Sequence, residues 1–224
     1  MKRKNLTRWI LCVVIFIGLL AWGLVYWIYN SPDTDTAPVP YSLIARQYWY
    51  AKVNPWDLEQ VRSYCQKFGY NDDYYIICDF GRKSGKKRFY LYDLSTCDSI
   101  ISSYCMQGDG GGSTAEKPEF SNRMGSNCSS LGLFALKGIG AHKIKNCIRL
   151  VGLDHGNSNA YGRGLLIHSS KKTTFFRGQT DYIPLGVESH ECFTISAECL
   201  ARLMAIYHLH GKRKRILMWA CYQQ

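Results

Sequence analysis

The feature that most constrains this chain is an almost unbroken apolar run near its N-terminus, Trp9–Tyr29. Its 21 residues match the roughly 20 that an α-helix needs to cross a bilayer. Aromatic residues stand near both ends, as is typical of the two membrane–water interfaces. A cleaved signal peptide would have a shorter apolar region and small residues at its cleavage site, where bulky aromatics stand here. We therefore expect an uncleaved transmembrane signal anchor over residues 9–29.

Charge predicts the orientation of this anchor. Residues 1–8 carry four basic side chains and no acidic one, so we expect this stub in the cytoplasm and the rest of the chain outside. The whole chain has 28 Lys and Arg residues against 17 Asp and Glu residues, a formal charge of +11. Most of the other basic residues are scattered, and the anchor removes the chain from the cytoplasm. We therefore expect a membrane as a partner, through residues 9–29, and no nucleic acid.

Residues 30–53 are predicted to be a tether, because Ser31–Pro40 is polar and rich in proline. The remaining residues, 54–224, suffice for one domain of ordinary size. With 46% hydrophobic residues, the chain can bury a sizeable core. We therefore expect four parts: a basic stub (1–8), the anchor (9–29), the tether (30–53) and a folded domain (54–224).

Patterning within the domain predicts mainly short strands. One helix is expected to start with Asn54 as its N-cap and to stop at Gly69, and a second is expected after Ser196. Apolar and β-branched runs predict strands at residues 74–79, 87–93, 98–106, 146–153, 164–168 and 216–222. Two basic clusters, residues 82–88 and 212–215, are interpreted as solvated turns. A mainly β domain with a few short helices is the physical expectation.

Cys192 is the residue with the clearest chemical potential. His190 precedes it by two positions, and His168 ends an apolar run 24 residues earlier. A thiol becomes a strong nucleophile when a neighbour takes its proton, and imidazole titrates near neutral pH. The simpler alternative is a structural cysteine, because most cysteines are buried or form disulfides and this chain has ten. The residues alone leave both interpretations open.

Further segments recur in a fixed order along the chain: Phe120-Ser121-Asn122, Gly125-Ser126, Ser129-Ser130-Leu131-Gly132, Gly152-Leu153-Asp154, Asn159-Ala160 with Arg163, the strand ending in His168, and Ser189-His190-x-Cys192. Together they resemble the L,D-transpeptidase catalytic domain family (the YkuD type), and within it the murein L,D-transpeptidase branch. The resemblance covers about Asp57 to Tyr207. It implies a β-sandwich or barrel and an enzyme of the bacterial inner membrane, with its catalytic domain on the periplasmic side.

The resemblance also implies roles for individual residues. Cys192 matches the nucleophile, His168 its base, and His190 the histidine of the Ser-His-Gly-Cys motif. The implied reaction is a thioester with a peptidoglycan stem peptide, formed at the L-centre of the diamino acid before a terminal D-alanine and passed to an amine. Candidates for the oxyanion site or for substrate binding are Glu191, Ser189, Ser129, Ser130, Gly132, Asn122 and Arg163. We expect no cofactor and no metal.

The expected oxyanion donors are the backbone N–H groups around Glu191 and Cys192. Glu191 stands where the family has glycine, and Gln107 and Thr194 also depart from the family pattern. We expect glutamate at position 191 to resist a positive φ and to disfavour the thiolate through like-charge repulsion. An L,D-carboxypeptidase, a degenerate homologue that binds peptidoglycan and a cysteine hydrolase of other specificity therefore remain alternatives.

Nine cysteines follow the apolar run, and eight remain if Cys192 is a free thiol. Disulfide bridges in an oxidising periplasm and reduced, buried thiols are both open, because pairing cannot be read from sequence.

Overall fold

The computed structural model describes residues 42–223, except 142, 143, 145, 177 and 187–189, together with Val13, residues 16–20 and Trp22. The chain forms two compact units, Met1–Thr34 and Asp35–Gln224. The described residues of the first unit are helical, and the rest of the predicted anchor lies outside the described residues. Within the part of the chain that is described, no helix is long and apolar enough to cross a membrane.

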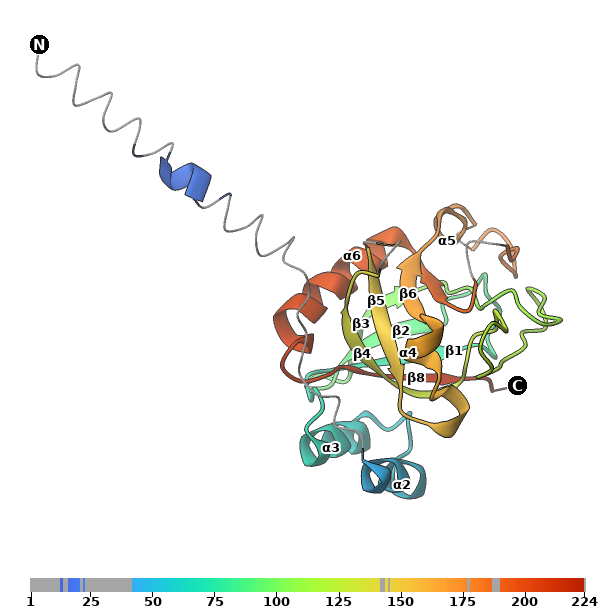
Figure 1. Ribbon diagram of the computed structural model, residues 1–224, viewed down its shortest axis with the longest axis horizontal. Helices are drawn as coiled ribbons and strands as arrows, with labels where there is room; N and C mark the ends of the chain where they lie inside the picture. The colour runs from blue at the N-terminus through green and yellow to red at the C-terminus, as the bar shows by residue number, and fades with distance from the viewer. Residues whose placement is uncertain are drawn as a thin grey trace, which may run out of the picture. The chain divides into compact units, whose positions relative to one another are not determined.

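The second unit is built on one eight-stranded sheet of order β3-β2-β1-β8-β4-β5-β6-β7 (Figure 1). The strands are β1 (Tyr74–Asp79), β2 (Phe89–Asp93), β3 (Asp98–Ser103), β4 (Gly132–Ile139), β5 (Cys147–Gly152), β6 (Leu166–Ser169), β7 (Phe193–Ile195) and β8 (Leu217–Cys221). The β1–β8 and β6–β7 pairs are parallel, and the other neighbouring pairs are antiparallel.

The two edges of this sheet meet. Met106, just beyond β3, exchanges backbone hydrogen bonds of 2.9 and 3.2 Å with Thr194 of β7. The sheet is therefore nearly closed into a barrel, and the predicted mainly β fold is confirmed. Strand β4 was not predicted from the sequence, although it pairs with both β5 and β8.

The helices of the second unit are short. They are α2 (Leu43–Lys52), α3 (Leu58–Phe68), α4 (Ala160–Arg163), α5 (Lys171–Phe175) and α6 (Ala197–Ile206), with a 3-10 turn η1 (His155–Asn157) and a π-helical extension η3 (Tyr207–Gly211). Figure 1 shows α6 on one side of the sheet and α2 with α3 on the other.

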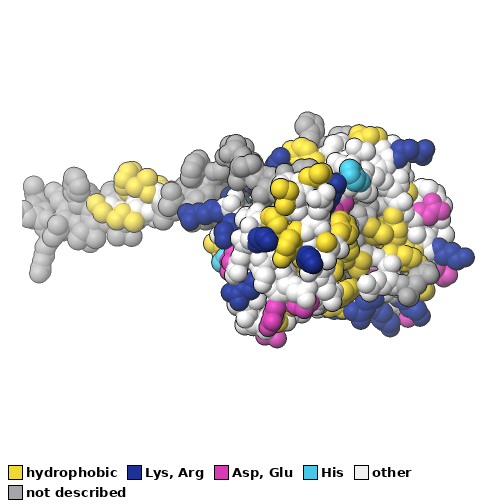
Figure 2. Space-filling model, turned by 90° about the horizontal axis from the view of Figure 1, so that it is seen from below, with side chains coloured by type: hydrophobic (Ala, Val, Ile, Leu, Met, Phe, Trp, Pro, Cys, Tyr) yellow, Lys and Arg dark blue, Asp and Glu magenta, His cyan; other side chains and the backbone are white. Residues whose placement is uncertain are grey.

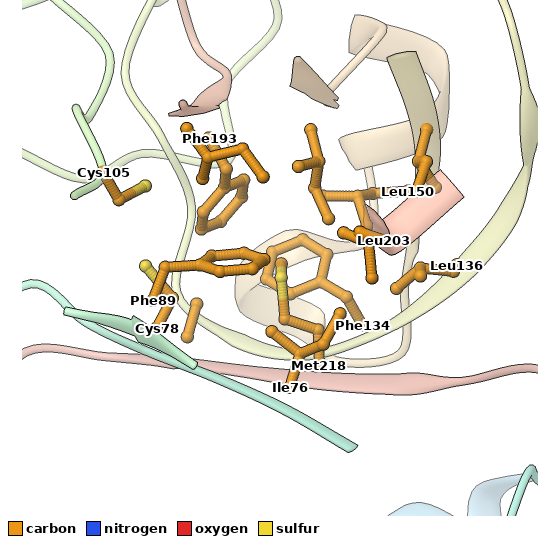
Figure 3. Close-up of a cluster of buried hydrophobic side chains, with 14 of the residues drawn as sticks. Ile76, Cys78, Phe89, Cys105, Phe134, Leu136, Leu150, Phe193, Leu203 and Met218 are labelled. Atoms are coloured by element: carbon orange, nitrogen blue, oxygen red, sulfur yellow. The ribbon is translucent and has the colours of Figure 1, made fainter. Parts of the chain in front are cut away.

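Alternation along the strands gives the sheet two apolar faces. In β1, Ile76 and Cys78 point into the inner core, which α6 also enters through Leu203. Tyr75 and Ile77 point to the outer face, where they pack with α2 and α3. Figure 3 shows the inner core, in which side chains from β1, β2, β4, β5, β7, β8 and α6 converge.

The predicted tether is wrong for its C-terminal part. Residues 43–52 form α2, and the side chain of Trp49 is buried edge-on against Tyr64 of α3, with ring centroids 4.9 Å apart. Ala45 and Trp49 supply an apolar pair at helical spacing, which the proline-rich residues before them obscured. The N-cap of α3 is Asp57, whose side chain accepts the Gln60 N–H, and not the predicted Asn54.

The solvated-turn interpretation is wrong for one residue in each basic cluster. Arg88 is buried and donates to the Cys105 carbonyl and to the side chain of Gln107. Arg215 is buried and donates to the Tyr207 hydroxyl. On the face seen in Figure 2, the remaining basic side chains lie in separate groups with acidic ones between them.

All nine cysteines in the described part of the chain are free thiols. Seven of them are buried, including Cys192. In the structure, the reduced alternative therefore applies to each of these nine residues.

Candidate active site

Cys192 lies immediately before β7 and is positioned by its neighbour Phe193. The Phe193 ring points into the inner core (Figure 3) and packs 5.4 Å from Phe80 and 5.6 Å from Phe134, measured between centroids. Successive side chains of a strand point to opposite faces. The Cys192 side chain therefore lies on the outer side, where it clusters with Leu166 and Cys147.

His168 lies on the neighbouring parallel strand β6. The register pairs Ile167 with Phe193 and His168 with Thr194, so that His168 shares the sheet face of Cys192. The His168 side chain is largely buried, and its Nδ1 lies 3.1 Å from the Ser169 carbonyl oxygen. Since a carbonyl only accepts, Nδ1 carries the hydrogen and Nε2 is the basic nitrogen.

The Cys192 thiol is buried, and its Sγ lies 4.0 Å from the Gly164 carbonyl oxygen. The pKa of this thiol is raised to about 12, mainly by burial and in part by the negative charge of Glu191. The backbone of Leu166 and the charge of Arg163 act in the opposite direction. At neutral pH the sulfur is therefore a thiol that needs a base before it can react.

The residue before Cys192 has an unusual backbone conformation. Glu191 has a φ of 56°, and the Cys192 N–H donates to the His190 carbonyl at 2.6 Å, which closes a γ-turn. Glutamate therefore adopts the positive φ that it was expected to resist. This conformation costs a non-glycine residue about 1–2 kcal/mol. It is held by the Glu191 N–H, which donates to the Asn127 carbonyl, and by the Glu191 carbonyl, which accepts from Ser129 Oγ.

This turn also affects the expected oxyanion donors. The N–H of Glu191 and the N–H of Cys192 both donate to carbonyls of the protein. In this geometry neither group is aimed at a substrate oxygen, so the expected donors are not preformed.

Arg163, at the end of α4, joins the polar segments around the cysteine. Its side chain is fully buried, and its Nε donates to the Glu191 carboxylate at 2.9 Å. The two terminal nitrogens donate to the Ser121 carbonyl, Ser130 Oγ, Ser126 Oγ and the Cys128 carbonyl. These five bonds match the five N–H donors of a guanidinium group. Arg163 therefore holds the protein together at this point and has no donor left for a substrate.

The other predicted binding residues also bond within the protein. Asn122 donates to the His155 carbonyl and accepts from the Asn159 N–H, which joins two of the segments that carry the family resemblance. Ser129 Oγ accepts the Gly108 N–H. Gly132 has a φ of 108°, and a Cβ there would lie 2.3 Å from the Asp154 carboxylate. Ser189 lies outside the described residues, and substrate contact by any of this set stays a prediction.

Sequence reasoning missed Asp109 as a site residue. His190 is half-exposed, and its Nδ1 lies 2.7 Å from Asp109 Oδ1. Asp109 belongs to the glycine-rich loop at residues 108–112. An acidic residue between Gly108 and Gly110 was the available signal.

Comparison with protein families identifies the family of the chain. The family described as L,D-transpeptidase catalytic domain matches residues 51–212. The chain belongs to this family. The matched region contains every candidate residue named above, from Gln107 to Cys192. A search of curated proteins found no significant match.

Gln107, named above as a departure from the pattern of the L,D-transpeptidase family, has a structural role. Gln107 is buried, accepts from Arg88 and donates to the Thr114 carbonyl at 3.0 Å. In the structure this side chain supports the base of the glycine-rich loop.

Proposed function

We propose that this chain is a membrane-anchored peptidoglycan L,D-transpeptidase that works through a thioester on Cys192. The observation that carries the proposal is the state of His168: the Ser169 carbonyl holds the hydrogen on Nδ1, and the ring lies on the sheet face of Cys192. A buried thiol with a raised pKa requires such a base. Family membership supports peptidoglycan as the substrate.

In the first half-reaction, His168 Nε2 takes the thiol proton as Sγ attacks the carbonyl of the L-centre in the donor stem. The bond to the terminal D-alanine breaks, and the imidazolium returns the proton to the departing amine. In the second half-reaction, the amine of another stem peptide attacks the thioester. An amide forms, and the Cys192 thiol is regenerated.

The tetrahedral intermediates need N–H donors, so the Glu191 turn opens when substrate binds. The Cys192 N–H is the donor of a γ-turn bond, which closes a strained three-residue ring. The substrate oxygen replaces the His190 carbonyl as its acceptor. This exchange keeps the number of hydrogen bonds constant while the charge develops.

The anchor at residues 9–29 and an inner-membrane location with a periplasmic domain belong to the same proposal. The length of the apolar run and the basic stub before it support this part. Alkaline carbonate extraction of bacterial membranes tests it. The full chain stays in the membrane pellet, and a variant without residues 1–34 is released.

A degenerate homologue that binds peptidoglycan without turnover is the second candidate. The engagement of both N–H groups in the Glu191 turn favours it, as does the raised pKa of the thiol. An L,D-carboxypeptidase, in which water replaces the amine, differs from the transpeptidase only in the acceptor.

Product analysis separates these functions. The purified full chain in mild detergent is incubated with disaccharide tetrapeptides, and the muropeptides are resolved by mass. Crosslinked dimers together with free D-alanine support the transpeptidase, whereas tripeptide alone supports the carboxypeptidase. No product, with retained binding to sacculi, supports the degenerate homologue. Matched reactions with His168→Gln test the assigned base and are expected to lose activity at least a hundredfold.

A further inference from the structure

We infer that Asp109 is a positioning residue that fixes His190 as the base for the incoming acceptor amine. This inference rests on the proposed transpeptidase function and assigns a residue to its second half-reaction. It starts from the contact between His190 Nδ1 and Asp109 Oδ1, two residues that are 81 positions apart in the chain.

The loop that carries Asp109 packs closely against residues 126–129. The Gly108 N–H donates to Ser129 Oγ at 2.9 Å, and the Gly110 N–H donates to the Asn127 carbonyl at 3.0 Å. A Cβ on Gly108 would lie 2.3 Å from the Asn127 carbonyl oxygen, and one on Gly110 would lie 1.9 Å from the Ser126 carbonyl oxygen. The glycines on either side of Asp109 therefore allow the loop to lie flat on residues 126–129.

The same residues hold the nucleophile turn. The Asn127 carbonyl accepts the N–H of Gly110 and the N–H of Glu191, and Ser129 Oγ bonds both Gly108 and the Glu191 carbonyl. The loop that carries Asp109 and the turn that follows His190 are thus bonded to the same two residues, Asn127 and Ser129. These shared bonds bring Asp109 and His190 into contact.

A carboxylate can only accept, so His190 donates its Nδ1 hydrogen to Asp109 and presents Nε2 as the basic nitrogen. The carboxylate also stabilises the imidazolium that forms when Nε2 takes a proton. The thioester half-reaction requires a second base, because the acceptor arrives as an ammonium group. His190 removes one proton from the ammonium group, and the amine attacks the thioester carbonyl. His168, neutral after the first half-reaction, takes the second proton from the attacking nitrogen and passes it to Sγ as the C–S bond breaks.

The position of His190 suits this role. Its side chain is half-exposed, whereas His168 and Cys192 are buried. Asp109 is the charged residue that contacts the His190 ring, and the titratable residues that follow His190 in the chain are Glu191 and Cys192. The Glu191 carboxylate is already bonded to Arg163, so Asp109 is the acidic group that acts on the ring.

Two measurements on Asp109→Asn test the inference, with Glu119→Gln as the matched control. Glu119 accepts the Gly112 N–H at 3.0 Å, so it supports the same loop without contacting His190. The full chain is first acylated with a tetrapeptide and then mixed with a tripeptide amine acceptor over a range of pH. Separately, the tautomer of the His190 ring is determined by NMR from its nitrogen signals, with His190→Gln assigning them.

With Asp109→Asn, acylation is expected to stay within twofold. The alkaline plateau of aminolysis falls roughly tenfold or more. The His190 ring, which carries its hydrogen on Nδ1 in the wild type, populates both tautomers, and Glu119→Gln changes neither result. An aminolysis profile equal to wild type, or an equal loss in acylation, overturns the inference. If the wild-type protein is never acylated, the proposed function fails, and an unchanged His190 tautomer in Asp109→Asn separately overturns the role of Asp109.

Discussion

Arg163 Nε lies 2.9 Å from a carboxylate oxygen of Glu191, and this ion pair fixes the side chain of the residue before Cys192, whose φ is positive. A glycine would adopt this φ without strain, whereas Glu191 adopts it with its backbone N–H and carbonyl both bonded. Glu191 is therefore compatible with the backbone geometry of the turn, and its remaining effect on Cys192 is electrostatic.

Arg163→Met is expected to destabilise the domain by about 3–5 kcal/mol, because it removes the buried donor of the Glu191 carboxylate and of the Cys128 carbonyl. Chemical denaturation followed by tryptophan fluorescence measures this change. The matched control is Arg123→Met, an exposed arginine from the adjoining segment, which is expected to change stability by less than about 0.5 kcal/mol. Equal free energies of unfolding for the two variants would contradict this structural role of Arg163.

Glu191→Gly is expected to speed alkylation of Cys192 by iodoacetamide. The substitution keeps a positive φ accessible and removes a negative charge that raises the pKa of the thiol. Since one pKa unit changes the thiolate fraction about tenfold at neutral pH, a roughly two- to tenfold increase is expected. Peptide mass mapping separates Cys192 from the exposed Cys97. An unchanged rate at Cys192 would exclude this electrostatic effect.

The pH dependence of the same alkylation tests the burial of the thiol. Burial raises the pKa of Cys192 to about 12, so the thiolate fraction at neutral pH is small and grows with each step towards higher pH. The rate at Cys192 should therefore still rise between pH 8 and pH 10, estimated as about tenfold per unit. A plateau near pH 8 would indicate a thiolate stabilised by its surroundings.

Trp49→Ala is expected to cost about 3–5 kcal/mol of unfolding free energy, because the indole is 1% exposed between α3 and the sheet. Ile44→Ala on the same helix is the control, since Ile44 is 70% exposed and should be nearly neutral. Thermal unfolding distinguishes the two variants. Similar melting temperatures would indicate that residues 43–52 do not pack stably on the domain.

Strands in which apolar and polar residues alternate, or in which apolar residues are continuous, could be predicted from the sequence. Strand β1 and helix α3 were found nearly at their observed bounds, because their periodicity is strong and Gly69 marks the stop. Strand β4 was missed because its sequence, Gly-Leu-Phe-Ala-Leu-Lys-Gly-Ile, follows a turn-like segment and contains two glycines. Both glycines have positive φ, so the backbone there departs from a regular strand.

The candidate residues of the site could be named from the sequence, but their connections could not. Cys192 and His168 were named from residue type and family resemblance, and their catalytic roles stay predictions. The five bonds of Arg163 and the contact of Asp109 with His190 depend on loops that meet only in three dimensions. For that reason the sequence assigned Arg163 to the substrate and overlooked Asp109.

The central claim is that Cys192 accepts the acyl group of a stem peptide. Intact mass spectrometry of the full chain, quenched in acid after mixing with a disaccharide tetrapeptide, tests it directly. We predict an increase equal to the donor minus D-alanine, located on the Cys192 peptide and absent from Cys192→Ser. An unchanged mass at every quench time, while crosslinked product accumulates, would contradict a thioester mechanism.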